Sequence, residues 1–390
     1  MQKYYEFYNP TKILCGKNAL ENIGYELLRL QGNNPVIITD QKLYELGHPK
    51  LVQMILEDFD IFINLVIKDV PTDSSISLAS KYAQLCIDVE CDSIIAIGGG
   101  SVLDMAKAIN LLVSKKASNL LDLQGANIII GALNPFIAIP TTSGSGSEVT
   151  KIFVASDRKT KTKKEFVSES FYPDVAILDI RMIDTMPRKI TAISAVDALV
   201  QGIEAYTSLQ KNPLSDSFST EAIRLICRNI NLALFNNKKG RIALANAALM
   251  AGIALSNSMV GMIHAISHAI GSVCHINHGN VLAAILIPCM EFNKNKLDSL
   301  YSKLLFYISD EDIYSHTSTD ERTNMTIYLL KSLLDNLKEK AKIPLRLRDL
   351  GVKQEMFNEI AILALDDGAM ITEPNDINKN DIVTILNNSY

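Results

Sequence analysis

Four of the six histidines of the chain lie close together in the sequence, at positions 264, 268, 275 and 278. His264 and His268 are four residues apart, so they share one face if this stretch forms a helix. His278 follows His264 by fourteen residues and precedes Gly279, where we expect a helix to break. A single buried histidine is usually a core residue with a hydrogen-bond partner, whereas several together favour a divalent metal ion bound between them.

An earlier helical pattern, DALVQGIEAY at 197–206, carries an acidic residue among apolar ones. Asp197 and Gln201 are again four residues apart and share a helix face. A carboxylate buried among Ala, Val and Ile is costly unless it is paired or ligated. Asp197 and two of the histidines would therefore place one carboxylate and two imidazoles around a divalent ion. A solvated helix face is the alternative, and Glu204 fits that alternative.

Two loops of small residues each follow an apolar run. The first, SIIAIGGGSVLDMAKAIN at 93–110, has three consecutive glycines before a helical pattern. Three glycines let a backbone pass close to a bulky ligand, and the N–H groups at the start of the next helix then face a phosphate. A tight strand-to-helix turn is the alternative, but it needs fewer glycines, and the dinucleotide fingerprint G-x-G-x-x-G is absent.

The second loop, FIAIPTTSGSGSEVT at 136–150, offers many hydroxyl donors. Two such loops, each at the carboxyl end of a parallel strand, fit the crevice where α/β sheets bind ligands. Asp40 ends a further apolar run, VIITD. Its carboxylate could accept hydrogen bonds from a ribose 2′-OH and repel a 2′-phosphate, or it could cap the following helix, and both roles are compatible.

The elements that must position these residues change in type near Pro187. Before it, apolar runs rich in Val and Ile predict buried parallel strands, with helical spacing between some of them. After it, long helical patterns follow one another with no clear strand between them. We therefore predict an α/β domain at 1–187 and an all-helical domain at 188–390. The expected strands lie at 36–39, 61–66, 93–97, 136–139 and 175–178, with an edge hairpin at 4–14, and the expected helices at 43–58, 76–89, 192–208, 215–234, 241–258 and 324–340.

Composition excludes several classes of protein. The 390 residues are 48% hydrophobic and 21% charged, which argues against disorder. The net charge is -5 without a strong basic cluster, so nucleic acid binding is not expected. Six cysteines without a C-x-x-C pair, and no signal peptide, predict a cytoplasmic protein with reduced thiols. Residues 242–290 contain no Asp, Glu, Lys or Arg, but polar residues interrupt them every few positions, so we predict helices buried in a soluble protein rather than a membrane span.

Several motifs together resemble the iron-containing (group III) alcohol dehydrogenases, along the whole chain. They are FYNPTKILCGKNALENIG at 7–24, GGGSVLDMAKAI at 98–109, PTTSGSGSEVT at 140–150, PDVAILD at 173–179, DALVQGIEAY at 197–206, AGIALSNSMVGMIHAISHAIG at 251–271 and HGN at 278–280. The resemblance implies an N-terminal Rossmann-like dinucleotide-binding domain followed by a helical metal-binding domain, a layout shared with dehydroquinate synthase.

Carried over by position, the resemblance implies the functional residues. NAD would be held by Asp40, Gly98, Gly99, Gly100, Ser101, Asp104, Thr141, Thr142 and Ser145, with Asp40 favouring NAD over NADP. The metal would be held by Asp197, Gln201, His264 and His278, with His268 beside it as a proton relay. Two departures stand out. Gln201 replaces the usual histidine, so Fe²⁺ could give way to Zn²⁺, and Thr372-Glu-Pro-Asn375 stands where members often carry Asn-Pro-Arg.

The implied activity is hydride transfer between NAD(H) and a small polar alcohol or aldehyde, with the metal polarising the substrate oxygen. A homodimer or larger homo-oligomer is expected by analogy, and no nucleic acid or membrane partner. Two alternatives remain open: a dehydroquinate synthase-like lyase that also uses NAD and a metal, and a non-catalytic relative that has kept NAD but lost effective metal binding.

Overall fold

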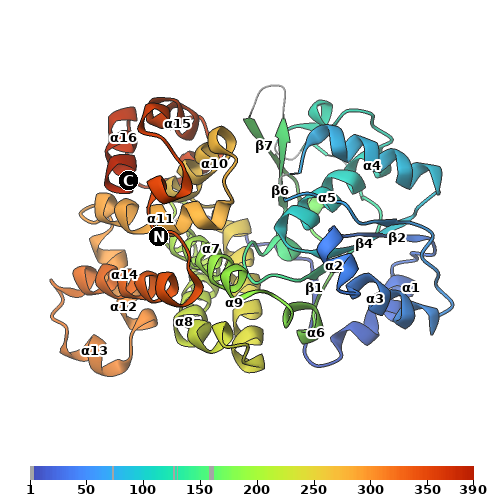
Figure 1. Cartoon of the computed structure of the whole chain (residues 1–390), viewed down its shortest axis with the longest axis horizontal. Coiled ribbons are helices and arrows are strands. Elements are labelled where there is room, and N and C mark those ends of the chain that lie inside the picture. The colour runs from blue at the N-terminus through green and yellow to red at the C-terminus, as the bar shows by residue number, and fades with distance from the viewer. Residues whose placement is uncertain (1–3, 73, 126–127, 130, 158–161) are drawn as a thin grey trace. The chain divides into compact units, whose positions relative to one another are not determined.

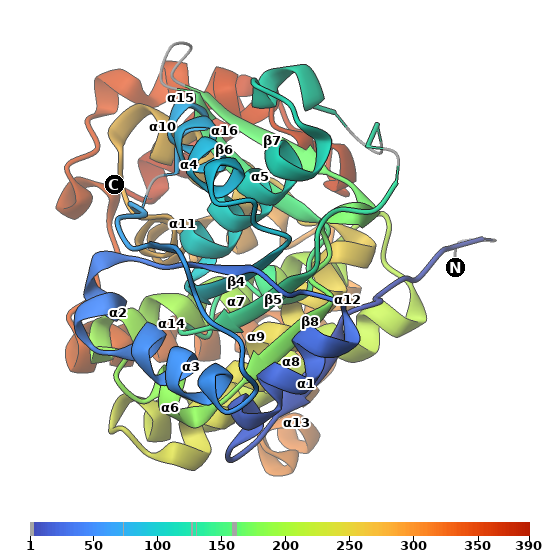
Figure 2. The ribbon, with the colours of Figure 1, turned by 90° about the vertical axis from the view of Figure 1, so that its right-hand side faces the viewer.

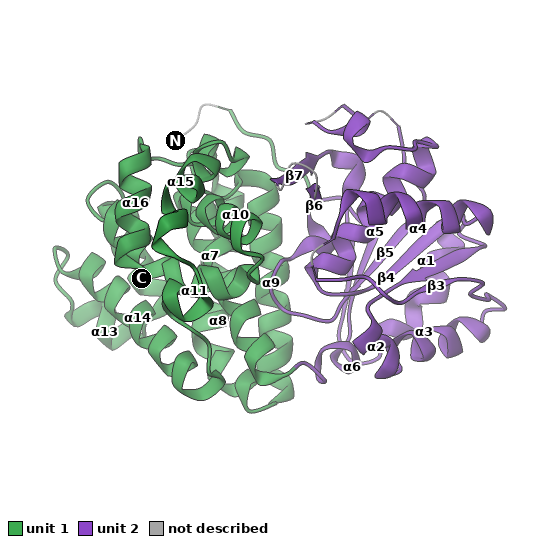
Figure 3. Cartoon of the chain, turned by 45° about the horizontal axis from the view of Figure 1, so that its top comes forward, with its two compact units in different colours: residues 1–8, 187–390 green, residues 9–186 purple. Residues whose placement is uncertain are grey.

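The computed structural model describes residues 4–390 apart from 73, 126–127, 130 and 158–161. It consists of two compact units, which Figure 3 colours separately. One comprises Asn9–Met186, and the other comprises Pro187–Tyr390 together with the first eight residues. The units differ from the predicted domains in placing the start of the chain with the helices. Tyr8 explains this placement, because its backbone N–H donates to Asn257 Oδ1 at 2.8 Å and its carbonyl accepts from Asn257 Nδ2 at 3.2 Å.

A six-stranded sheet forms the centre of the Asn9–Met186 unit. Its strands are all parallel, in the order β1-β8-β5-β4-β2-β3. Figure 2 shows β4, β5 and β8 side by side. The chain runs from β2 to β3 on one side and then to β4 on the other, so the order reverses between β2 and β4, the place where such sheets bind ligands. The strands are β1 Lys12–Cys15, β2 Pro35–Ile38, β3 Val66–Ile67, β4 Ser93–Gly98, β5 Phe136–Pro140 and β8 Val175–Leu178.

Helices cover both faces of this sheet, because the side chains of a strand alternate between its faces. Ile94 packs with the helices α4 (Ile76–Asp88) and α5 (Gly100–Lys115), and its neighbour Ile95 packs with α1 (Ile23–Arg29) and α3 (His48–Glu57). The two pairs of helices are seen on opposite sides of the strands in Figure 1. Burial of both faces explains why the strands are continuous apolar runs.

Three details of this unit differ from the expectations. The predicted helix at 43–58 is two helices, α2 (Gln41–Glu45) and α3, because Gly47 adopts a left-handed φ of 82° between them. The predicted strand at 61–66 is reduced to β3. The predicted hairpin at 4–14 is wrong, since among these described residues only the start of β1 is a strand, and β1 pairs in parallel with β8.

An antiparallel pair that the sequence analysis missed completes the unit. It consists of β6 (Ile152–Asp157) and β7 (Thr162–Val167), with the rings of Phe153 and Phe166 stacked at 4.6 Å. The remaining helices of the unit are α6 Ile180–Ile183 and the short 3₁₀ helices η1 Ala19–Asn22, η2 Leu120–Leu123, η3 Ser147–Val149 and η4 Glu169–Phe171.

The second unit is helical, and no strand occurs among its described residues. Its central helix α7 (Arg188–Thr207) is buried on almost every side, which is why its sequence lacks an amphipathic pattern. The other described helices of the unit are α8 Pro213–Leu234, α9 Lys238–Ser258, α10 Met262–Cys274, α11 His278–Asn293, α12 Asp298–Ile308, α13 Glu311–His316, α14 Arg322–Ala341, α15 Phe357–Leu365 and α16 Lys379–Asn388, with 3₁₀ helices η5 Leu347–Leu350, η6 Gln354–Met356 and η7 Gly368–Thr372 (Figure 1). Of these, α8, α9, α11 and α14 pack on α7.

The uncharged stretch at 242–290 forms most of α9, all of α10 and most of α11. No single helix in the described part of the chain is long and apolar enough to cross a membrane. Among the described residues, α9 and α10 taken together meet that test of length and composition, but the two are bent by 101°.

Candidate metal site and cofactor loops

Three side chains from three helices of the second unit converge on one small volume. Asp197 lies on α7, His264 on α10 and His278 at the first position of α11, and α11 packs against both other helices. One possible ligand atom from each lies within 4.8 Å of the other two. Asp197 Oδ1 is 3.7 Å from His264 Nε2 and 3.9 Å from His278 Nε2. These distances are too long for hydrogen bonds but suit atoms that share an ion.

Two polar atoms of this cluster are buried without a hydrogen-bond partner among the described residues, His264 Nε2 and Gln201 Oε1. Gln201 lies one turn after Asp197, and its Nε2 donates to Asp197 Oδ1 at 2.9 Å. Because the carboxylate can only accept, this bond leaves the amide oxygen of Gln201 for another partner. Buried polar groups are rarely unsatisfied. The two unpaired atoms and the adjacent carboxylate therefore fit a divalent cation.

Glu204, which the sequence analysis placed on a solvated helix face, is buried beside this cluster. One carboxylate oxygen contacts His264 Nδ1, and the other accepts the backbone N–H of Ile263 at 2.6 Å. Burial lowers the pKa of His264, but Glu204 and Asp197 outweigh it and raise the pKa to about 9. In the neutral ring, the form that binds a metal, a carboxylate on Nδ1 holds that nitrogen as the N–H and directs the Nε2 lone pair toward Asp197. The earlier interpretation of Glu204 is wrong because it considered α7 alone.

A second glutamate, Glu373, completes the support of α10. It accepts the backbone N–H of Met262 at 2.9 Å and the amide of Asn293 at 2.8 Å. Both glutamates thus cap the positive N-terminal end of the helix that carries His264. Gly261 lies between them, and a Cβ there would be 2.7 Å from Glu373 Oε2.

The unusual segment 372–375 acquires a structural explanation from these contacts. Asn375 donates to Asn293 Oδ1 at 3.0 Å, and Asn293 in turn donates to Glu373. The segment therefore ties the C-terminal part of the unit to the start of α10.

His268 and His278 each have a defined partner on Nδ1. His268 Nδ1 lies 3.0 Å from Asp367 Oδ2, and His278 Nδ1 lies 2.8 Å from Ser267 Oγ. Burial raises the pKa of Asp367, but the neighbouring His268 outweighs it and holds that pKa below its usual range. The ring centre of His268 is 5.2 Å from that of His278 and 6.1 Å from that of His264. His268 is thus adjacent to the cluster, in agreement with its predicted place.

Two expectations about this region need correction. Gly279 does not break a helix but belongs to the first turn of α11, where a Cβ would be 2.8 Å from the carbonyl oxygen of Ile193 on α7. His275 is an exposed residue in the left-handed conformation, with φ 56°, that ends α10. The cluster therefore contains two of the four neighbouring histidines, His264 and His278, and His268 lies beside it.

The predicted cofactor residues lie in the other unit, after the ends of neighbouring strands. Asp40 follows β2, the glycines end β4 and begin α5, and the hydroxyl loop follows β5. Asp40 caps α2 by accepting the N–H of Leu43 at 2.9 Å, so its N-cap role is confirmed. Its position at the reversal of strand order is the one expected for a residue that meets a ribose.

The three consecutive glycines are required by the packing of the chain itself. A Cβ on Gly98 would be 2.4 Å from Val102, on Gly99 3.0 Å from Thr142, and on Gly100 2.8 Å from Ser145. The two loops thus touch, so close packing of the turn accounts for all three glycines, although a tight turn was expected to need fewer. Thr141 joins the same junction, since its N–H donates to the carbonyl of Gly98 at 3.0 Å.

Two of the predicted cofactor residues use their side chains to hold this arrangement. Ser101 donates to the carbonyl of Thr72 at 2.7 Å. Asp104 accepts from Ser147 Oγ at 2.7 Å and from the N–H of Val154 at 3.2 Å. One hydroxyl that the sequence analysis did not single out as a site residue, that of Ser143, is buried without a partner among the described residues.

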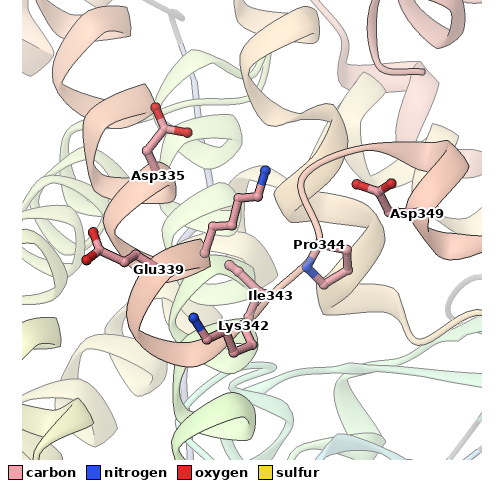
Figure 4. Close-up of a pocket in the computed structure, with 7 residues that line it drawn as sticks. Asp335, Glu339, Lys342, Ile343, Pro344 and Asp349 are labelled. Atoms are coloured by element: carbon pink, nitrogen blue, oxygen red, sulfur yellow. The ribbon is translucent and has the colours of Figure 1, made fainter.

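A surface pocket of the helical unit lies at the end of α14 and in the segment after it (Figure 4). None of the predicted site residues lines it. Its walls are mostly charged, and the lining residues are Asp335, Lys338, Glu339, Lys342, Ile343, Pro344 and Asp349.

Comparison with known proteins decides the family. The model of iron-containing alcohol dehydrogenase matches residues 10–180, and that of the C-terminal part of the Fe-containing alcohol dehydrogenase family matches residues 191–390. The chain belongs to the iron-containing alcohol dehydrogenase family. The resemblance, the fold class and the class of enzyme, an oxidoreductase acting on CH–OH groups, are thereby confirmed.

Relatives of this iron-containing alcohol dehydrogenase cover almost its full length. An NADPH-dependent butanol dehydrogenase of Clostridium saccharobutylicum is 31% identical over 98% of this chain and 97% of its own. A 1,3-propanediol dehydrogenase of Citrobacter freundii is 29% identical over 100% of this chain and 99% of its own. A crystal structure of a 1,3-propanediol oxidoreductase superposes with a TM-score of 0.94, at 28% identity and full coverage of both chains.

Proposed function

We propose that this member of the family transfers hydride between NAD(H) and a small polar alcohol or the corresponding aldehyde, at a divalent metal held by Asp197, Gln201, His264 and His278. The observation that carries the proposal is the pair of buried unpaired atoms, His264 Nε2 and Gln201 Oε1, beside Asp197 Oδ1. The family implies a divalent metal and NAD(H) binding.

A bound divalent ion supplies Lewis acidity, which lowers the pKa of an alcohol and stabilises the developing alkoxide of an aldehyde being reduced. The residues of this chain do the rest. Asp197 and the Glu204 carboxylate supply the negative charge that offsets the ion. Asp367 accepts the Nδ1–H of His268 and so holds His268 Nε2 as the atom that takes up or releases the proton of the substrate hydroxyl.

Gln201 supports a site that differs in metal preference from one with three imidazoles. An amide oxygen is a neutral, harder and weaker donor than imidazole, so it lowers affinity for the ions that favour imidazole, Fe²⁺ and Zn²⁺ alike, and metal titrations should include both. The side chain is held in place by its bond to Asp197.

We propose from the position of Asp40 that this enzyme prefers NAD to NADP. Relatives of this chain use different cofactors, since one is an NADPH-dependent butanol dehydrogenase and another an NAD-dependent methanol dehydrogenase of Bacillus methanolicus. A carboxylate at the reversal of strand order repels a 2′-phosphate and accepts from a free 2′-OH, which favours NAD. The glycine loop at 98–100 and the N-terminus of α5 then receive the pyrophosphate.

We also propose a cytoplasmic location and a homo-oligomeric state. The six cysteines, all among the described residues, form no disulfide, as is usual in a reducing compartment. Size-exclusion chromatography with light scattering measures the oligomer directly.

The decisive experiment is the metal content per chain after anaerobic purification, followed by NADH formation with a panel of small alcohols. We expect about one equivalent of one transition metal. His264→Ala should lose this metal, whereas His275→Ala, at the exposed neighbouring histidine, should keep it. Absence of metal from the wild type even after Fe²⁺ or Zn²⁺ is supplied, together with NAD binding without turnover, would instead establish a non-catalytic relative. Turnover of a substrate without net NADH would indicate a lyase.

A further inference from the structure

Ser267 lies on α10 directly before His268, and its side chain is fully buried. It faces α11 rather than its own helix. Its hydroxyl oxygen lies 2.8 Å from His278 Nδ1 and 3.4 Å from the carbonyl oxygen of His278. The motif at 264–268 therefore brings three side chains to the metal cluster, although only its two histidines attract attention in the sequence.

The two contacts of this hydroxyl determine where the proton of His278 resides. A serine hydroxyl has one proton to donate and two lone pairs with which to accept. The carbonyl of His278 can only accept, so both contacts are hydrogen bonds only if the hydroxyl proton points to that carbonyl. The hydroxyl must then accept from Nδ1, which makes Nδ1 the protonated nitrogen of His278. The other nitrogen, Nε2, is left with its lone pair.

That lone pair faces the metal cluster. His278 Nε2 is 3.9 Å from Asp197 Oδ1, the same oxygen that lies 3.7 Å from His264 Nε2. The backbone of His278 is fixed from the other side, because the next residue, Gly279, packs directly on the carbonyl of Ile193 in α7. The packing of α11 on α7 thus fixes the backbone position of His278, and the hydroxyl of Ser267 determines which ring nitrogen faces Asp197.

We propose that Ser267 is a positioning residue for the metal site, which holds His278 as the Nδ1–H tautomer with its Nε2 ready for coordination. This inference rests on the proposed metal-dependent function. It also gives the two histidines different support. His264 is held by the charged carboxylate of Glu204, whereas His278 is held by a neutral hydroxyl. The hydroxyl directs the ring without adding negative charge to a region that already contains Asp197 and Glu204.

The test compares Ser267→Ala with the wild type in two measurements. The first is Zn²⁺ affinity, from competition of the metal-free protein with a chromophoric chelator. Loss of a group that orients a metal-bound histidine lowers metal affinity by about 10- to 100-fold, and we expect about 10-fold because the lost partner is neutral. The second is the ¹⁵N NMR spectrum of the histidine rings in the metal-free protein. We expect His278 as the Nδ1–H tautomer in the wild type and a shift toward Nε2–H in the variant.

Ser389→Ala is the matched control. Ser389 is also a buried serine of the helical unit, and its hydroxyl donates to the carbonyl of Ile385 at 2.8 Å, at the end of α16. It should leave Zn²⁺ affinity and the His278 tautomer unchanged. Ser267→Thr keeps the hydroxyl and should restore affinity to within about threefold of the wild type.

The outcomes separate this inference from the proposed function. A wild type that binds no Zn²⁺ and no Fe²⁺ refutes the metal-dependent function itself. A wild type that binds metal, with Ser267→Ala binding it equally well, overturns the role of Ser267 alone. If Ser267→Ala fails to fold, the wild-type spectrum still decides, since an Nε2–H tautomer of His278 contradicts the proposal.

Discussion

Glu204 offers the sharpest test of how the site is built, through the isosteric change Glu204→Gln. The wild-type carboxylate accepts from His264 Nδ1 and from the N–H of Ile263. A glutamine can keep one of these two bonds, but its amide group then presents N–H to the second donor. If the bond to Ile263 is kept, His264 must turn Nδ1 into an acceptor, and its proton moves to Nε2, the atom that faces Asp197.

The expected magnitude follows from this change of tautomer. Removing a carboxylate that orients a metal-bound histidine lowers metal affinity by about 10- to 100-fold, which corresponds to about 1.4–2.7 kcal/mol. The metal-free protein should also lose about 2 kcal/mol of unfolding free energy, the usual value of a buried hydrogen bond to a charged group. Release of the repulsion between Glu204 and Glu373 offsets part of that loss, since Glu204 contributes to the raised pKa of Glu373.

Glu373→Gln is the matched control. Glu373 caps the same helix end, but its carboxylate bonds to Met262 and Asn293 and not to a ring of His264 or His278. Metal affinity is measured by chelator competition, and stability by urea unfolding of the metal-free proteins. We expect both variants to be less stable than the wild type and only Glu204→Gln to lose metal affinity by tenfold or more. Equal metal affinity of Glu204→Gln and the wild type would refute the reasoning, as would an equal loss of affinity in both variants.

Four further predictions concern other parts of the chain. Gln201→His should raise affinity for Fe²⁺ without unfolding the protein, and superimposable metal titrations of the two proteins would show that position 201 does not contact the ion. His268→Ala should lower turnover by about 10²- to 10⁴-fold while metal content stays at the wild-type level, and unchanged turnover would remove the proton-relay role. Asp40→Asn keeps a good helix cap but removes the charge, so the ratio of kcat/KM for NAD over NADP should fall by roughly fivefold, from about 1 kcal/mol of repulsion, with an unchanged Tm. Burial raises the pKa of Glu148 to about 7 from its usual value of 4.5, so the native state binds more protons than the unfolded state between these values, and the unfolding free energy should fall as pH rises from 4.5 to 7. Glu148→Gln should flatten that pH dependence, and an equally steep profile in the variant would contradict the assignment.

The sequence predicted well the parts that depend on one element at a time. The strands around 93–97, 136–139 and 175–178 were found because strands buried on both faces are uninterrupted apolar runs. The sharing of a face by Asp197 and Gln201, and by His264 and His268, follows from helical spacing alone. The hairpin of β6 and β7 was missed because its polar and charged residues, such as Lys163 and Glu165, hide the alternation of a strand.

The supporting contacts of the site could not be predicted, since they join elements far apart in the chain. Asp367 is 99 residues from His268, and Glu373 is 111 residues from Met262. Spacing within a helix shows which residues share a face, but it does not show which other helix covers that face. Glu204 illustrates the consequence, because a glutamate on a helix is usually exposed, whereas this one is buried and bonds to two residues at the start of α10.

The uncharged stretch at 242–290 also has a consequence for the unfolded chain. In the native unit its residues are distributed over three packed helices, and two of these carry His264 and His278. When these helices open, a long uncharged segment becomes exposed to solvent. Without charged side chains, no electrostatic repulsion prevents the exposed segments of two chains from associating. A metal held, as proposed, by residues of α7, α10 and α11 would oppose that opening by mass action. We therefore expect depletion of metal to appear as precipitation on mild heating before it appears as a soluble inactive enzyme, with turbidity rising at lower temperature as chelator is added.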